Sequence, residues 1–327
     1  MTNESKIKYS VIVPVHNAQK SLHKCLESIL RSKLTEIEVI CINDASTDIS
    51  GKILENFTKK DPRVKVITLT ENQGVAAARN YGLEVASGEI IGFVDSDDSI
   101  DGDHLFNIYN KMKEESSDIN IISFKFIKPD KVIYFPDLSK FISNFGNETQ
   151  TMYDVDKLTF LDDYCWRLSV RRDFLSKHGL RFPKGIKGSE DQCFWKPLQL
   201  KATRVSFLEN YGYNYFWNPE SITKKEMSSF ETVKGIDELM RRTPPEYHLK
   251  FMEKCFKRIN DFKMKNVKLQ NQLKREYVGR IYQKAREVGA EGYSLMNYDY
   301  KIGLLHVSVK DGSKELSFLG WKVPLIN

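Results

Sequence analysis

The first 127 residues alternate short β-branched, apolar runs with longer stretches in which apolar residues recur every three or four positions. The short runs predict strands, and the longer stretches predict amphipathic helices. Strands that alternate with helices are typical of a parallel sheet with helical crossover connections. We predict strands at 9–15, 37–42, 64–69, 90–94 and 119–124, and helices at 17–32, 50–60, 74–86 and 103–115.

The remaining chain has a less regular pattern. Residues 128–160 are rich in Pro, Asn and Ser and predict an irregular connection, and residues 160–223 predict a shorter mixed region. A helical pattern covers 226–289, with a break at Pro244-Pro245. The last 25 residues predict short strands.

The composition is that of a globular protein. The chain has 327 residues, which suggests about two domains, and 41% of them are hydrophobic and 29% charged. No apolar run is long enough to span a membrane, and the first eight residues lack the apolar segment of a signal peptide. The five cysteines form no C-x-x-C pair, so we expect reduced thiols and a cytoplasmic protein without a zinc site.

The positive charge is concentrated toward the C-terminal end of the chain. A net charge of +6 is too mild to indicate nucleic-acid binding. Residues 224–290 contain 17 Lys and Arg against 9 Asp and Glu, a balance of +8, so the rest of the chain carries −2. This segment either contacts an anionic membrane surface or is a packed subdomain with a solvated basic face.

Polar residues follow three of the predicted strands. Asn17 follows the first strand, Asp44 the second, and Asp95-Ser96-Asp97-Asp98 the fourth. Ligands of parallel α/β sheets gather at these strand ends. None of the junctions has a glycine-rich phosphate loop, which argues against a dinucleotide-binding fold, a P-loop NTPase and a nucleotidylyltransferase.

The acidic run after the fourth strand predicts a cation site. Asp95, Asp97 and Asp98 would repel one another unless a cation lay among them, and oxygen ligands suit Mg²⁺ or Mn²⁺. A solvated acidic turn is the alternative interpretation of so short a motif. A calcium loop that starts at Asp97 is excluded, because its twelfth position is Ile108 and not Glu.

Taken together, these segments resemble the inverting family 2 glycosyltransferases, which have the GT-A fold. The resemblance covers about residues 9–127. It implies a Rossmann-like α/β fold with a mainly parallel central sheet and flanking helices, followed here by a mostly helical C-terminal region. The matching segments are Ser10-Val-Ile-Val-Pro-Val-His-Asn17, Asn43-Asp-Ala-Ser-Thr-Asp48, Asn72-Gln-Gly-Val-Ala-Ala-Ala-Arg-Asn80 and Phe93-Val-Asp-Ser-Asp-Asp98.

The resemblance implies roles for individual residues. Asp44 would contact the nucleotide base, Asp95 would lie near the ribose, and Asp97 with Asp98 would hold Mn²⁺ or Mg²⁺ at the diphosphate of a UDP-sugar. Taken singly, Asp44 is equally well explained as a turn or helix-capping residue. The other donor-binding residues that the resemblance implies are Pro14, Val15, Asn17, Asn72, Gly74, Arg79 and Ser96.

A second, looser resemblance covers residues 160–223 and concerns bacterial enzymes that build surface polysaccharide and lipooligosaccharide. It implies that the Glu190-Asp191 pair supplies the catalytic base. The sequence has Arg167 where Lys is usual and Trp217 where a basic residue often stands. The segments that carry this second resemblance are Trp166-Arg-Leu-Ser-Val-Arg-Arg-Asp-Phe174, Gly179-Leu-Arg-Phe-Pro183 and Ser189-Glu-Asp-Gln-Cys-Phe194.

These observations predict an inverting, metal-dependent hexosyl- or N-acetylhexosaminyltransferase that acts on a glycan or lipid-linked acceptor. We expect a catalytic domain at 1–223, with a donor-binding half at 1–127 and an acceptor half at 128–223, and a basic helical region at 224–327. A nucleotide-sugar nucleotidylyltransferase and an inactive nucleotide-binding module are the alternatives.

Overall fold

The computed structural model describes residues 6–135, 164–186, 189–218 and 229–248, and four strands between 293 and 323. The chain divides into two compact units. All the site residues predicted from the sequence belong to the first unit. The first unit comprises Met1–Tyr153, Asp162–Gly185 and Glu190–Pro219, and the second comprises Asp154–Leu161, Ile186–Ser189 and Glu220–Asn327.

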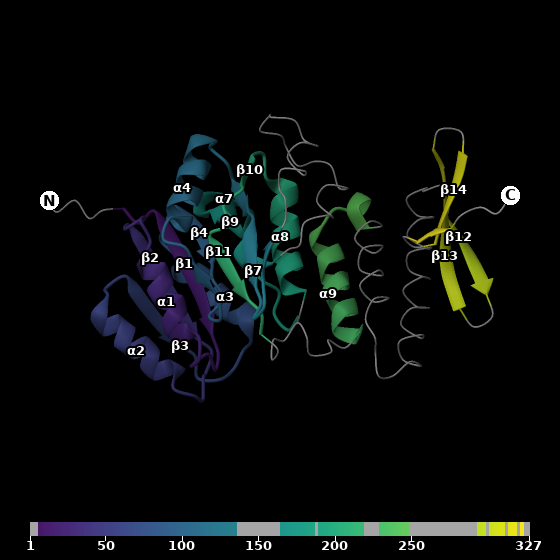
Figure 1. Ribbon diagram of the computed structural model, residues 1–327. Coiled ribbons are helices and arrows are strands. Elements are labelled where there is room, and N and C mark those ends of the chain that lie inside the picture. Colours follow the sequence, from purple (N-terminus) through teal and green to yellow (C-terminus); the bar gives the residue numbers. More distant parts are fainter. Residues whose placement is uncertain are drawn as a thin grey trace. The chain divides into compact units, whose positions relative to one another are not determined.

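A seven-stranded sheet forms the centre of the first unit (Figure 1). In spatial order its strands are β10 (Val205–Leu208), β6 (Ile119–Ile122), β9 (Leu168–Arg171), β4 (Ile90–Phe93), β1 (Tyr9–Val15), β2 (Ile37–Asn43) and β3 (Val64–Thr68). Strand β1 pairs in parallel with β2 and β4, β2 with β3, and β6 with β10. This mainly parallel arrangement confirms the predicted α/β fold.

The central strands are continuous apolar runs because both faces of the sheet are covered. Every residue of β1 and β2 is buried, although successive side chains point to opposite faces. The helices of this unit are α1 (Leu22–Leu30), α2 (Ser50–Lys60), α3 (Val75–Val85), α4 (His104–Glu114), α7 (Arg172–His178) and α8 (Glu190–Lys201). Helix α3 contacts β1 and β2, α2 contacts β3, and α4 contacts β6 and β10.

Helix α3 lies unusually close to the sheet. A Cβ atom on Gly82 would come within 2.4 Å of the Cγ2 atom of Ile12, so only glycine permits this approach. The close packing holds the helix against strand β1. It thereby fixes Arg79, one turn earlier on α3, beside the central strands.

Strand β9 is the main departure from the predicted fold. It runs antiparallel to both of its neighbours, β4 and β6, and separates them in the sheet. The sequence predicts only a mixed region there. The predicted strand at 119–124 is also divided, because β6 ends at Ile122 and a new strand, β7 (Phe124–Ile127), enters a second sheet.

The second sheet has four strands in the order β5 (Ser99–Ile100), β11 (Tyr213–Phe216), β7 and β8 (Val132–Phe135). Strand β8 falls in a segment that the sequence predicts to be irregular. An aromatic cluster lies against this sheet: the ring of Trp166, in the short helix η1 (Cys165–Arg167), stacks on Tyr213 with centroids 4.2 Å apart. This stacking anchors η1 to strand β11.

The second unit contains helix α9 (Ser229–Arg242), the short helix η3 (Pro245–Tyr247) and an antiparallel sheet. The end of α9 before Pro244 agrees with the predicted break. The sheet consists of β12 (Tyr293–Tyr298), β13 (Lys301–Lys310), β14 (Ser313–Phe318) and β15 (Trp321–Val323). Residues 249–292, most of the predicted basic helical segment, lie outside the described residues. No helix in the described part of the chain could cross a bilayer.

Candidate active site

Three loops meet where parallel strands β1, β2 and β4 end. The strand registers place Val15 beside Asn43, and Ile12 beside Phe93. The residues that follow these strands therefore share one edge of the sheet, the usual ligand site of an open parallel α/β sheet. Pro14 and Val15 form the buried end of β1 itself.

The loops after β1 and β2 are bonded to each other. The side-chain oxygen of Asn17 accepts a hydrogen bond from the backbone N–H of Thr47 at 2.8 Å, and the Asn17 N–H donates to Ser46 Oγ at 3.1 Å. His16 Nδ1 donates to the carbonyl oxygen of Asp44 at 2.7 Å. Asn17 has a left-handed backbone, with φ of 50°, which asparagine tolerates better than most residues. These bonds fix the shape of the predicted nucleotide-binding edge.

Asp44 is bonded to the start of helix α3. Its carboxylate accepts hydrogen bonds from the backbone N–H groups of Gln73 at 2.7 Å and Gly74 at 2.8 Å, and the residue is 3% exposed. Gly74 has a φ of 85°, a conformation that favours glycine. The amide of Asn72 lies 3.1 Å from the His16 ring, which joins this loop to the first one. Contact of Asp44 with a base stays a prediction.

The acidic loop after β4 is clamped by strand β11. Tyr213 Oη donates to Asp98 Oδ2 at 2.8 Å and accepts from the Asp95 N–H at 3.2 Å. The backbone N–H of Phe216 donates to the other oxygen of Asp98 at 2.9 Å. Asp98 is 1% exposed, and its burial raises the pKa of the carboxyl well above its usual range. These bonds hold the Asp98 carboxyl against strand β11, and the metal role of Asp98 stays a prediction.

Asp97 and Ser96 are half-buried, and Asp97 is only weakly bonded. The amide of Asn218 lies 3.5 Å from Asp97 Oδ2, and partial burial together with the charge of Asp95 raises the pKa of Asp97. Within the described ranges, no three His, Cys, Asp or Glu side chains come close enough to hold a metal ion. A site with one or two carboxylates still fits Mg²⁺ or Mn²⁺, because such ions commonly take their other ligands from substrate phosphates and water.

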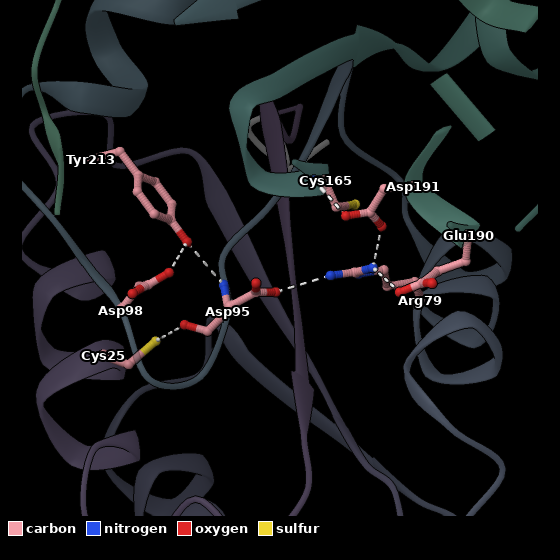
Figure 2. Close-up of polar contacts among 8 residues, drawn as sticks. All are labelled: Cys25, Arg79, Asp95, Asp98, Cys165, Glu190, Asp191 and Tyr213. Carbon is pink, nitrogen blue, oxygen red and sulfur yellow. Dashed lines mark hydrogen bonds and ion pairs between the residues drawn. The ribbon is translucent and has the colours of Figure 1, made fainter. Parts of the chain in front are cut away.

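Arg79 lies at the centre of the carboxylate cluster (Figure 2). Its Nη1 atom donates to Asp191 Oδ1 at 2.6 Å, and its Nη2 atom donates to Asp95 Oδ1 at 3.1 Å. Glu190 Oε1 lies 3.8 Å from the same Nη1 atom. The Arg79 side chain is 4% exposed, so helix α3 presents a buried cation to three carboxylates. The residue predicted to bind the donor thus joins the acidic loop to the predicted base.

Asp191 and Glu190 form the first turn of helix α8. Asp191 Oδ2 accepts a hydrogen bond from the backbone N–H of Cys165 at 2.9 Å. Burial is the largest influence on Asp191 and raises its pKa to about 7, while Arg79 opposes the rise. A carboxyl group that titrates near neutral pH is suited to accept and release protons.

Several site residues escape the sequence analysis. Tyr213 and Asn218 bond to the acidic loop from more than a hundred residues away, and Cys165 bonds to Asp191 through its backbone. Arg167, which replaces a usual lysine, is 1% exposed and donates through Nε to the carbonyl oxygen of Ile122. No local pattern marks these contacts, because they depend on how distant strands pair.

The mainly parallel sheet with its strand-end loops is the arrangement expected of the GT-A fold. Residues 10–179 match the family model for glycosyl transferase family 2. The chain therefore belongs to this family, and the resemblance found in the sequence is confirmed.

Several bacterial proteins are similar to this chain. The uncharacterized glycosyltransferase EpsJ of Bacillus subtilis (strain 168) is 32% identical over 218 residues, which cover 66% of this chain and 62% of EpsJ. EpsH of the same strain is 30% identical over 293 residues, which cover 86% of this chain and 81% of EpsH. Poly(ribitol-phosphate) beta-N-acetylglucosaminyltransferase TarS of Staphylococcus aureus (strain MW2) is 30% identical over 249 residues, 72% of this chain and 39% of TarS. The chain thus spans less than two thirds of EpsJ and of TarS.

Solved structures support the same fold. The crystal structure of S. aureus TarS 1–349 in complex with UDP-GlcNAc has a TM-score of 0.68 at 22% identity and covers 95% of this chain and 98% of that one. Mannosyltransferase PcManGT from Pyrobaculum calidifontis, in complex with GDP-Man and Mn²⁺, has a TM-score of 0.52 at 16% identity. The match covers 86% of this chain and 76% of the PcManGT chain.

Proposed function

We propose that this chain transfers a hexosyl or N-acetylhexosaminyl group from a nucleotide sugar, most simply a UDP-sugar, to a hydroxyl group of a glycan or lipid-linked acceptor, with inversion at the anomeric carbon. The observation that supports it best is the bridge formed by Arg79, which joins Asp95 of the predicted donor loop to Asp191. This bridge brings a titratable carboxyl group beside the predicted donor site.

Asp191 acts in this proposal as the general base. The acceptor hydroxyl transfers its proton to the Asp191 carboxylate while its oxygen bonds to the anomeric carbon and the bond from that carbon to the diphosphate breaks. The attack comes from the face opposite the leaving group, so no covalent sugar–enzyme intermediate is needed. Among the residues that the structure describes, buried Glu190 Oε2 has no hydrogen-bond partner, so it is suited to accept a bond from a substrate hydroxyl.

The donor would lie along the edge formed by the ends of β1, β2 and β4. We propose that Asp44 and the loop at Asn17 contact the base, that Asp95 and Ser96 lie near the ribose, and that Asn72 and Gly74 flank the diphosphate. Asp97 would hold a divalent cation, Mn²⁺ or Mg²⁺, which when bound stabilises the negative charge of the leaving group. The PcManGT complex with GDP-Man and Mn²⁺, a protein of similar fold, is consistent with this choice.

We propose acceptors of the bacterial surface polysaccharide or lipooligosaccharide type, and a cytoplasmic location at the inner face of the membrane. The name of the relative TarS specifies a poly(ribitol-phosphate) acceptor, another cell-surface polymer. In this proposal residues 1–223 form the catalytic domain, with the acceptor half at 128–223, and the basic segment 224–290 contacts anionic lipid. Vesicle sedimentation at low and high NaCl tests that contact, since electrostatic binding must weaken with salt.

The experiment that tests the activity is incubation with UDP-, GDP- and CMP-sugars and Mn²⁺, with and without glycan acceptors, followed by phosphorus and proton NMR. We expect release of a nucleoside diphosphate and a product whose anomeric configuration is opposite to that of the donor. Release of pyrophosphate in a parallel incubation with a nucleoside triphosphate and a sugar 1-phosphate would instead indicate a nucleotidylyltransferase. Binding of a donor without any turnover would contradict the proposal and favour an inactive nucleotide-binding module. Absence of both binding and turnover for every donor would contradict the proposal and that alternative.

A further inference from the structure

The two arginines described near the proposed site, Arg79 and Arg167, are not accessible to the donor diphosphate. Both Nη atoms of Arg79 are bonded to carboxylates, and its side chain is 4% exposed. Arg167 lies in the core and donates to the carbonyl oxygen of Ile122. Two or more negative charges on a nucleoside diphosphate would enter an edge that already carries several carboxylates, so a further cation is needed there.

Lys24 on helix α1 is such a cation. It is exposed, and its Nζ atom lies 3.7 Å from the centroid of the Phe216 ring. Over the ranges that the structure describes, no carboxylate forms a salt bridge with it, in contrast to many other lysines of this unit. A cation above an aromatic face is held by the negative charge of that face, so the ring directs an otherwise flexible side chain.

The ring beneath Lys24 belongs to the strand end that holds the acidic loop. The N–H of Phe216 donates to Asp98 Oδ1 at 2.9 Å, and two residues later Asn218 reaches Asp97. On α1, the residue after Lys24 is Cys25, whose thiol contacts the carbonyl oxygen of Asp95 at 3.6 Å (Figure 2). Helix α1, which carries Lys24, and strand β11, whose ring lies beneath Lys24, therefore both contact the acidic loop.

We propose that Lys24 binds a phosphate group of the nucleotide-sugar donor. This inference rests on the proposed function, since it names a substrate contact of that site. A lysine ammonium is a compact charge with three donors and can follow a phosphate without the fixed geometry of an arginine. The exposure of Lys24 leaves its ammonium accessible, whereas Arg79 is enclosed.

The test is isothermal titration calorimetry of uridine, UMP and UDP with the full chain and Mn²⁺, comparing wild type with Lys24→Met. Methionine keeps a long side chain on Phe216 and removes the charge. We expect UDP to bind about tenfold more weakly, which corresponds to about 1.4 kcal/mol, and uridine to bind as before. The loss should shrink at high salt. Lys33→Met, an exposed lysine just beyond the other end of α1, is the matched control and should leave all three affinities unchanged.

Two results would overturn the assignment while leaving the proposed function intact. The first is equal affinity of wild type and Lys24→Met for UDP, and the second is a loss that is as large for uridine as for UDP. If UDP affinity is unchanged but the KM for a phosphate-bearing acceptor rises, Lys24 serves the acceptor and not the donor. A wild-type chain that binds none of UDP, GDP and CMP overturns the proposed function as well.

Discussion

Replacing Arg79 with methionine tests how the proposed base is controlled. In the structure the guanidinium lies 2.6 Å from Asp191 and 3.1 Å from Asp95, and Glu190 completes the cluster. Methionine is of similar length but carries no charge, so the three carboxylates lose their shared cation. Because Arg79 favours the ionised form of Asp191, its removal raises the pKa of Asp191 further. We expect the acidic limb of the kcat profile to move to higher pH.

The size of the effect follows from the charge geometry. Two unit charges about 4 Å apart, at an effective dielectric constant of about 20, interact by about 4 kcal/mol, equivalent to about three pH units. The Asp191 side chain retains 23% exposure, so water screens part of this interaction. We therefore expect a displacement of about one to two pH units, and a kcat at pH 7 lowered about 10- to 100-fold.

The assay is the dependence of kcat on pH between about 5.5 and 9.5 at constant Mn²⁺, for wild type, Arg79→Met and Arg79→Lys. Lysine retains a charge but cannot bridge both carboxylates as a fork, so its profile should lie between the other two. Activity of Arg79→Met should recover as the pH rises. A variant with low activity but an unmoved acidic limb would refute the electrostatic explanation and leave Arg79 with a purely structural role.

The same variant should also be less stable. Removing one partner of a buried ion cluster destabilises a protein by about 3–5 kcal/mol, and the partial exposure of Asp95, 29%, and Asp191 reduces that figure here. Thermal unfolding must therefore accompany the kinetics. The unfolding curve shows whether Arg79→Met is folded at the assay temperature. It therefore separates activity lost by unfolding from activity lost because the pKa of Asp191 is higher.

Three further predictions concern the carboxylates. Asp97→Ala should remove the Mn²⁺-dependent part of donor affinity in calorimetry and leave the melting temperature nearly unchanged, and an unaltered Mn²⁺ dependence would exclude Asp97 as a ligand. Asp191→Asn should lower kcat by about 10²- to 10⁴-fold while donor affinity persists, whereas Glu190→Gln should be milder; the reverse order would identify Glu190 as the base. Burial raises the pKa of Asp98, so its neutral form stabilises the fold at low pH and this contribution is lost as pH rises above about 4. In EDTA, Asp98→Asn should gain stability relative to wild type between pH 4 and 8, and a constant difference would contradict this.

Local sequence patterns predict the parallel part of the fold well. Helix α2 begins and ends where its apolar spacing predicts, because that pattern reflects one buried face. The predicted 74–86 helix is observed as α3, whose consecutive residues 76–80 are all buried. Strand β9 could not be predicted in the same way. Its four residues acquire their place by pairing with strands more than forty residues earlier, and nothing within the segment specifies either partner.

The sequence predicts which residues lie at the candidate site better than it predicts the contacts that those residues make. Strand-end positions identify Asp44, Asp95 and Asp97 because parallel strands bring their ends to one edge. The burial of Asp98 depends on Tyr213, 115 residues later, and the contact of Arg79 with Asp191 spans 112 residues. Sequence spacing contains no information about such pairs, so the orientation of each carboxylate had to come from the structure.

These long-range contacts also bear on how the two predicted halves of the catalytic domain work together. The acceptor half contributes β9 to the middle of the main sheet and Tyr213 to the acidic loop, while the donor half contributes Arg79 to the base. Neither predicted half can form its part of the site alone. The acidic loop of the donor half is held by Tyr213 of the acceptor half, and the predicted base of the acceptor half is paired with Arg79 of the donor half. Asp95 influences Asp191 through the guanidinium that they share and also directly, as a like charge that raises the pKa of Asp191, so we expect donor occupancy and ionisation of the predicted base to be thermodynamically linked.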